Sequence, residues 1–190
     1  MDSIEKYLEL SRKCPELFAQ SEELPLVLEP KELYAFAQIS GKRIGIVYES
    51  HYHFMVVDVV RAKDGSTFAY ERLMNRVMGG AVVIVPYYRG KYILLCQYRH
   101  ALREYQYGFP RGFGEEGISA KENAGKELLE ELGVKAEKWK DLGKIVPDSG
   151  ALGTSAGIFL AELSEAPQMI REEEKVGHIA LGWEQLGEWI

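Results

Sequence analysis

The stretch GFGEEGISAKENAGKELLEELGV, residues 112–134, decides the fold of this chain. It opens with glycines, and Ser119-Ala-Lys-Glu122 then fits a helix capping box. Gly133 suits a left-handed helix stop. Apolar residues recur every four positions between these signals, at Ala124, Leu128 and Leu132. The spacing predicts a glycine loop followed by a helix over about 120–132, with this apolar stripe buried.

A second face of the predicted helix carries Glu127, Glu130 and Glu131, which the i, i+3 and i, i+4 spacings bring together. Carboxylates that lie so near to one another repel, so a positively charged partner would stabilise this face of the helix. Mg²⁺ binds through a few carboxylates together with waters and substrate phosphates. Two interpretations stand: a solvated acidic helix face, and a metal site beside a polyphosphate. The upstream turn Gly108-Phe-Pro-Arg-Gly112 favours the metal site.

Residues 112–134 resemble the Nudix box, G-x5-E-x7-R-E-U-x-E-E-x-G-U, in which U is a bulky aliphatic residue. The part E-U-x-E-E-x-G-U is matched in full from Glu127 to Val134. Two positions depart, because Ile118 stands where the box has glutamate and Lys126 where it has arginine. Lysine keeps the charge and loses the bidentate fork. Two acids just upstream are candidates to replace the missing glutamate, namely Glu115 and Glu116.

The resemblance covers roughly residues 44–190. The segments 82–85, 92–99 and 108–112 are similar to those of ADP-ribose pyrophosphatase-type Nudix enzymes. It implies an α/β fold, an α/β/α sandwich with a mixed sheet between helices. A small N-terminal helix and an antiparallel strand region are expected before it. We therefore expect an N-terminal helical and β-strand region at 1–75 and a Nudix hydrolase domain at 76–190.

Periodicity and turn residues predict the remaining elements. Helices are expected at 2–20, with a break at Pro15, and from Pro30 to Ala37. Strands are expected at 44–49, 52–61, 66–73, 81–87, 91–98, 155–163 and 178–183, with a short segment near 139–146 and a helix starting at 184. Asp64-Gly65 and Arg89-Gly90 mark turns. Similar proteins usually continue past the last helix, so we expect a truncated chain or a shortened last lobe.

The resemblance also assigns roles to residues. Glu127, Glu130 and Glu131 would bind Mg²⁺ or Mn²⁺ with the backbone carbonyl of Arg111, and Glu130 is counted among the catalytic candidates as well. The general base of such enzymes is a glutamate from a loop late in the chain. The matching segment holds Glu172, Glu173 and Glu174, of which Glu173 and Glu174 are favoured. A solvated charged loop is the competing interpretation of 171–175.

Substrate contacts are expected beside this site. Arg99 and Arg111 flank the expected cleft and could pair with phosphate. Tyr98, Tyr105 and Tyr107 could stack on adenine, or equally pack in the core or a dimer interface. Pro147 is an approximate match to a proline that such enzymes carry after the box. His51 and His53 alternate along a predicted strand, but without a third ligand nearby a metal pair is the weaker interpretation.

The function implied is metal-dependent hydrolysis of a pyrophosphate that links a nucleoside diphosphate to another group, first of all ADP-ribose to AMP and ribose 5-phosphate. Alternatives within the class are NADH, a diadenosine polyphosphate or a nucleotide sugar. A nucleotide sensor without turnover is the alternative outside it. Ile118 and Lys126 favour the sensor, whereas the three intact glutamates favour the enzyme.

Composition limits the partners. The chain has 190 residues, 46% of them hydrophobic, with a net charge of −6, which supports a packed core and no affinity for nucleic acid. No signal peptide or membrane-length apolar run is visible, and Cys14 and Cys96 are expected as free thiols, so a cytoplasmic protein is expected. The resemblance implies a homodimer through 44–73, where four apolar residues would need a partner surface: Phe54, Val56, Val59 and Phe68.

Overall fold

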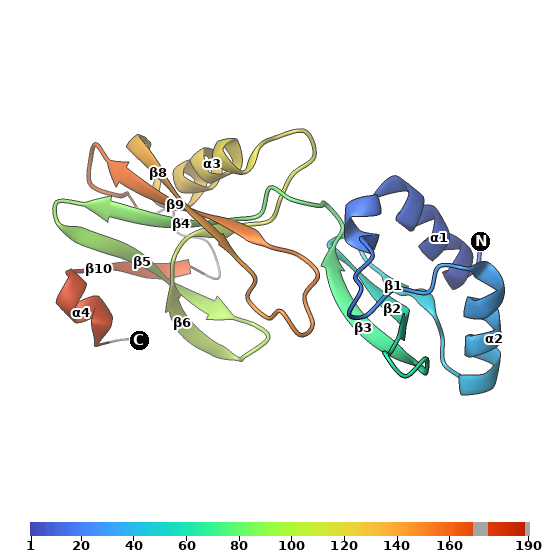
Figure 1. Cartoon of the computed structure of the whole chain (residues 1–190). Coiled ribbons are helices and arrows are strands. Elements are labelled where there is room, and N and C mark those ends of the chain that lie inside the picture. Colours follow the sequence, from blue (N-terminus) through green and yellow to red (C-terminus); the bar gives the residue numbers. More distant parts are fainter. Residues whose placement is uncertain (169–174, 189–190) are drawn as a thin grey trace. The chain divides into compact units, whose positions relative to one another are not determined.

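The computed structural model describes residues 1–168 and 175–188, and the chain in it divides into two compact units. The first unit comprises Met1–Arg76 together with Pro147–Thr154, and the second comprises Val77–Val146 and Ser155–Ile190 (Figure 1). The predicted division at residue 75 stays a prediction about domains. The segment 147–154 lies in the first unit because Leu73 and Leu152 form a β-bridge.

The first unit combines helices with a small antiparallel sheet. Its elements are α1 (Ser3–Lys13), a 3-10 helix at Pro15–Phe18, α2 (Pro30–Ser40), β1 (Gly45–Glu49), β2 (His53–Arg61) and β3 (Thr67–Asn75), with the strands in the order β1-β2-β3. The helix predicted at 2–20 breaks at Pro15, as expected, because proline has no N–H to continue the α-helical ladder. Pro30 opens α2, where that missing donor costs nothing.

A cluster of polar side chains that hydrogen-bond to one another lies in the core of this unit. Asp58 on β2 is 1% exposed, and the Tyr7 hydroxyl donates to its Oδ1 at 2.6 Å. Arg72 on β3 donates to both carboxylate oxygens and also to the backbone oxygen of Leu17. Every strong partner of Asp58 is therefore supplied from α1 and the sheet, which indicates a structural role.

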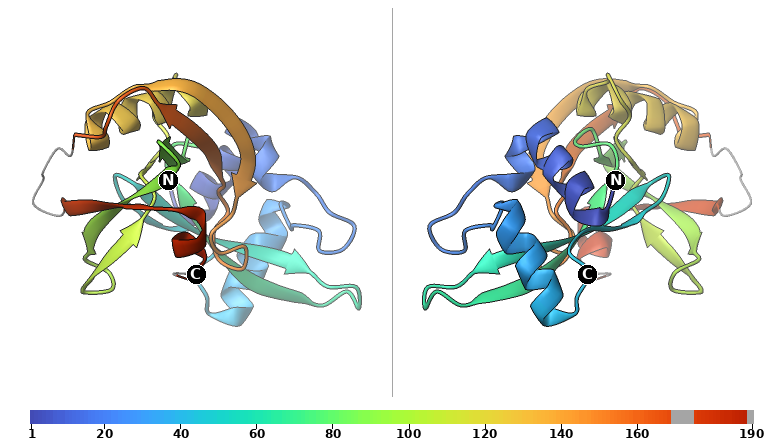
Figure 2. Two further views of the ribbon diagram at one scale, coloured as in Figure 1. Left: turned by 90° about the vertical axis from the view of Figure 1, so that its left-hand side faces the viewer. Right: turned by 90° about the vertical axis from the view of Figure 1, so that its right-hand side faces the viewer.

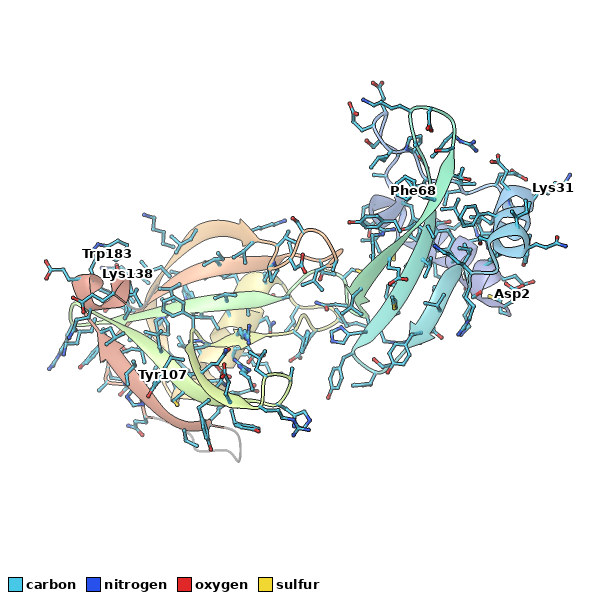
Figure 3. The ribbon with its side chains drawn as sticks, turned by 90° about the horizontal axis from the view of Figure 1, so that it is seen from below. Asp2, Lys31, Phe68, Tyr107, Lys138 and Trp183 are labelled. Atoms are coloured by element: carbon cyan, nitrogen blue, oxygen red, sulfur yellow. The ribbon has the colours of Figure 1, made fainter. Side chains whose placement is uncertain are left out.

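The apolar residues of 44–73 were expected to need a partner surface, and for three of the four this prediction is wrong. Phe54, Val56 and Val59 are buried within the chain itself. The segment at Val27, whose N–H donates to the oxygen of Val59, accounts for part of this cover. Phe68 on β3 remains partly exposed (Figure 3).

The second unit is built on a mixed sheet, as the α/β sandwich prediction required. Its elements are β4 (Val82–Tyr88), β5 (Lys91–Arg99), β6 (Glu104–Gly108), β7 (Arg111–Gly112), α3 (Ala120–Leu132), β8 (Ala136–Ile145), β9 (Ala156–Leu163), β10 (Lys175–Leu181) and α4 (Trp183–Gly187). The strand order is β10-β5-β4-β9-β8, with β6 paired to β5 and β7 to β4. Only β4 and β9 are parallel among these pairs.

The sheet forks between β4 and β5. These strands are joined by Arg89-Gly90, both with positive φ, as a two-residue turn of the I′ type requires. They pair only beside that turn, through Tyr87 with Tyr92 and Tyr88 with Lys91. Further on, β5 pairs with β10 and β6, while β4 pairs with β9 and β7. The chain from β6 to β7 therefore occupies the opening of the fork.

Helix α3 has the bounds that the capping signals predicted. Ser119 accepts from the N–H of Glu122, whose side chain returns to Ser119, and Gly133 ends the helix with φ of 65°. The apolar stripe packs on β4 and β9 in a core that includes Val82, Ile84, Leu95, Ala124, Leu128, Leu132 and Phe159. Helix α4 packs against β5 and β10, and Figures 1 and 2 show the two helices on opposite sides of the sheet.

Several elements differ from the sequence prediction in their bounds. Strand β6 was not predicted, the last strand begins at Lys175 and not at residue 178, and Trp183 belongs to α4. The segment expected near 139–146 is a longer strand, β8, that bulges at Gly143. No helix in the described part of the chain has the length and apolarity needed to cross a membrane.

Candidate active site

The three glutamates of α3 lie in different surroundings. Glu131 is 5% exposed, Glu127 is half-buried, and the side chain of Glu130 is 53% exposed. The difference follows from the position of each residue relative to the buried Leu128 and Leu132. Glu127 and Glu131 are i, i+4 neighbours, so the less exposed carboxylates are also adjacent on the helix.

Glu131 is held through one of its two oxygens. Its Oε1 lies 3.2 Å from the ammonium of Lys175 on β10 and accepts from the amide of Gln97 on β5 at 3.4 Å. Its Oε2 is buried and has no hydrogen-bond partner within the described residues. Burial raises the pKa of this carboxyl, and Lys175 opposes the rise.

Glu127 lies directly against the backbone at Gly112, the first glycine of the box. A Cβ at position 112 would be 1.9 Å from Glu127 Oε1, so the close approach depends on glycine there. Burial, and then the charges of Glu131 and Glu130, raise the pKa of Glu127 to about 7. The negative charge of this carboxylate is therefore poorly compensated by the protein itself.

Glu127 and Glu131 would supply part of the coordination that a divalent cation requires. Glu127 and Glu131 offer hard carboxylate oxygens that repel each other, and one of them has an oxygen without a partner. Residues 1–168 and 175–188 contain no group of three His, Cys, Asp or Glu side chains gathered closely enough to hold a metal. The fit is thus to two carboxylates, with the remaining positions left to backbone, water or phosphate oxygens, which is the usual coordination of Mg²⁺.

Lys126 binds the loop and not the central carboxylates. Its ammonium pairs with Glu115 in the loop before α3 and lies 3.8 Å from Glu130. The hydrogen bond to Glu115 is the main cause that raises the pKa of Lys126. Glu115, one of the two acids considered as a replacement for the missing box glutamate, is thus engaged by a lysine at the surface.

Asn123 is a buried clamp that the sequence did not single out. Its amide nitrogen donates to the backbone oxygens of Gly80 and Phe113, at 2.8 Å and 2.7 Å. Gly114 approaches the oxygen of Gly79 so closely that a Cβ would be 1.8 Å away. Asn123 therefore fixes the loop that carries Gly112 against the start of β4.

A cavity of about 190 Å³ lies in the fork of the sheet. It is lined by Val83, Arg99, Gln106, Tyr107, Gly108, Phe109 and Arg111. Both arginines expected at the substrate therefore border one cavity. Tyr107 on β6 also lines it, although it stands opposite Cys96, so its side chain lies on the same face as Tyr98 and Tyr105. Tyr98 and Tyr105 are a cross-strand pair with rings 5.3 Å apart, on the sheet face opposite Arg99, because side chains alternate along a strand.

Other expected residues lie elsewhere or outside the description. Glu172, Glu173 and Glu174 lie outside the described residues, so their role stays a prediction. His51 precedes β2 and is not on a strand; its ring packs on Tyr52. The sequence did not predict Gln97, Lys175 or Asn123 as site residues. Gln97 carried a signal, since it is a polar residue in the apolar run Tyr92-Ile-Leu-Leu-Cys-Gln97.

Comparisons with known proteins support the fold. The NUDIX domain family model matches residues 78–186, which is more than half of the chain. No curated protein matches the sequence significantly. A crystal structure described as an ADP compounds hydrolase is similar, with a TM-score of 0.67 and 20% sequence identity over 90% of this chain and 85% of the other. At that identity the likeness shows the fold.

Proposed function

The chain belongs to the Nudix family, and from this premise we propose that it hydrolyses the pyrophosphate bond of a nucleoside diphosphate linked to another group. Nudix hydrolases generally use divalent metal ions such as Mg²⁺. The observation that carries the proposal is the position of Glu127 against Gly112 beside Glu131, whose Oε2 is buried without a hydrogen-bond partner among the described residues.

Each residue has a definite task in this proposal. Glu127 and Glu131 would hold Mg²⁺ or Mn²⁺, with Glu130 and the carbonyl of Arg111 as further candidates. The bound cation supplies Lewis-acid polarisation and a lower pKa for the attacking water. Arg99 and Arg111 bind the phosphates from the cavity in the fork. Glu173 or Glu174 would take the proton from the water.

ADP-ribose is the substrate to test first, with AMP and ribose 5-phosphate as products. The crystal structure of an ADP compounds hydrolase with the same fold supports an ADP-containing substrate. The cavity of about 190 Å³ is smaller than the roughly 300–1,000 Å³ of sites that enclose a drug-sized ligand. It therefore suits a phosphate-bearing part of the substrate, and the base would lie beyond it.

The test is AMP release from ADP-ribose with Mg²⁺ or Mn²⁺. We expect Glu131→Gln to lower metal-dependent release by at least about 100-fold, because replacing a direct ligand costs more than disturbing a group behind it. Thermal unfolding should show a folded variant, and Glu137→Gln, an exposed carboxylate on β8, should keep full activity. Near-normal release by Glu131→Gln would remove the site assignment.

A second function has one observation in its favour. Lys126 pairs with Glu115, and Ile118 replaces the first acid of the box, so the site departs from the family pattern at two positions. A nucleotide sensor would bind without turnover. A panel of ADP-ribose, NADH, a diadenosine polyphosphate and a nucleotide sugar distinguishes the two: tight binding of one compound with no product would favour the sensor.

A further inference from the structure

A buried polar row connects the cavity to α3. Arg99 Nη2 donates to Gln97 Oε1, and Gln97 Nε2 donates to Glu131 Oε1 at 3.4 Å. Lys175 stands directly opposite Gln97 on the neighbouring strand β10, and its ammonium lies 3.2 Å from Oε1 of Glu131. Gln97 thus uses its oxygen toward Arg99 and its nitrogen toward Glu131.

The ion pair of Lys175 and Glu131 is well shielded from water. The Lys175 side chain is 12% exposed and that of Glu131 is 7% exposed. The other ion pairs in the described part of the chain, apart from Arg72 with Asp58, have both side chains at least one-third exposed. A buried carboxylate without a positive neighbour is costly, so this ammonium stabilises the metal-free protein.

The same carboxylate is the proposed metal ligand, and this creates a conflict. A divalent cation at Glu131 would lie within a few ångströms of the Lys175 ammonium, where their repulsion is strong because water screens it weakly. We propose that Lys175 is an internal counter-ion for Glu131 that gives up this carboxylate when a divalent cation binds. The inference rests on the proposed function, in which Glu131 holds that cation.

Lys175 is a positioning residue in this scheme. It keeps Glu131 folded inward before the metal arrives, and Gln97 keeps the carboxylate in place after the ammonium leaves. The free energy needed to displace Lys175 then makes the binding free energy of the metal less favourable. Removing the ammonium should therefore tighten metal binding while it weakens the metal-free fold.

Calorimetric titration with Mn²⁺ measures the first effect. We expect Lys175→Met to bind Mn²⁺ at least about tenfold more tightly than the wild type. Its Tm without metal should fall, and the rise in Tm on adding Mn²⁺ should exceed that of the wild type. Lys175→Arg should resemble the wild type. Lys138→Met is the matched control, because Lys138 pairs with Glu162 at the surface.

Acylation of lysines in the wild-type protein, followed by mass spectrometry, gives a readout that needs no variant. Lys175 should react faster with Mn²⁺ present than in EDTA, whereas Lys138 should react equally in both. Unchanged labelling of Lys175, or an Mn²⁺ affinity of Lys175→Met that is equal to or weaker than the wild type, overturns the inference.

Glu131→Gln separates this inference from the proposed function. If that variant binds Mn²⁺ as well as the wild type, Glu131 is no ligand, and the assigned metal site and the role of Lys175 both fail. If Glu131→Gln loses Mn²⁺ and Lys175→Met binds it unchanged, the proposed site stands and only the role of Lys175 is overturned.

Discussion

Glu127 and Glu131 lie one turn apart on the same helix, yet the chain compensates them unequally. Glu131 receives an ammonium and an amide, while the charges that act most strongly on Glu127 are those of Glu131 and Glu130. The lysine closest to it in sequence, Lys126, is directed to Glu115. At the residue scale the ionised form of Glu127 is therefore poorly compensated in the metal-free site.

This charge predicts how stability depends on pH. The pKa of Glu127 is raised from its ordinary 4.5 to about 7, mainly by burial. Between these values the folded chain keeps a proton that the unfolded chain has released, so stability in EDTA should fall as the pH rises from about 5 to about 7.5. Glu127→Gln should show a weaker fall in Tm across this range. An identical pH dependence for both proteins would contradict the assignment.

Lys126→Arg tests the departure from the Nudix box. The guanidinium retains the charge that pairs with Glu115 and Glu130 and adds a bidentate fork. We expect kcat/KM for metal-dependent hydrolysis to be maintained or raised. Lys121→Arg, at an exposed position on the same helix, is the control and should change nothing. A loss of more than about tenfold in the Lys126 variant alone would mean that this site is organised differently from the family pattern.

At the scale of the elements, local signals and distant pairings were unequally predictable. The bounds of α3 follow from Ser119 and Gly133, whose capping bonds lie within the helix ends, so the sequence alone suffices. Strand β6 is the short second strand of a hairpin with β5, and its five residues, Glu104–Gly108, were too few for the sequence pattern to predict it. The contact of Lys175 with Glu131 depends on the register of β10 against β5, which the sequence does not reveal.

The junction of β7 with α3 gives a prediction for Gly112→Ala. The new methyl group would clash with Glu127 from Cγ to Oε1, so the whole half-buried side chain would have to move, and stability should fall by about 1–3 kcal/mol. The Mn²⁺ affinity should fall about tenfold or more, as calorimetry would measure. Gly125→Ala is the matched control on α3, where a Cβ meets no atom within 4 Å. It should leave the affinity unchanged and raise stability by up to about 1 kcal/mol; equal affinities for both variants would contradict the assigned position of Glu127.

At the scale of the whole molecule, dimerisation remains a proposal. Tyr48, Met55 and Leu73 are paired across β1, β2 and β3, so they lie on one face of the first unit's sheet. Tyr48 is 58% exposed and Leu73 is 36% exposed, which leaves apolar surface that a second copy could cover.

Light scattering after size exclusion should therefore give twice the 21.5 kDa of the chain. Tyr48→Asp should shift the mass toward one chain, because a carboxylate would be buried in the interface. Tyr52→Asp, at an exposed position between β1 and β2, is the control and should remain dimeric. A single-chain mass for the wild type at micromolar concentration would remove the proposal.

The segment Pro147–Thr154 limits how the two units can be produced as separate fragments. It is contributed from within the sequence of the second unit, yet it folds with the first, where Leu73 donates to Ala151 and the Tyr70 hydroxyl donates to Gly150. The chain therefore passes between the units three times, near residues 76, 146 and 154. A fragment that starts at residue 77 would keep the segment 147–154 but lose the β3 residues that it contacts. Producing the second unit alone therefore requires shortening or replacing 147–154 as well.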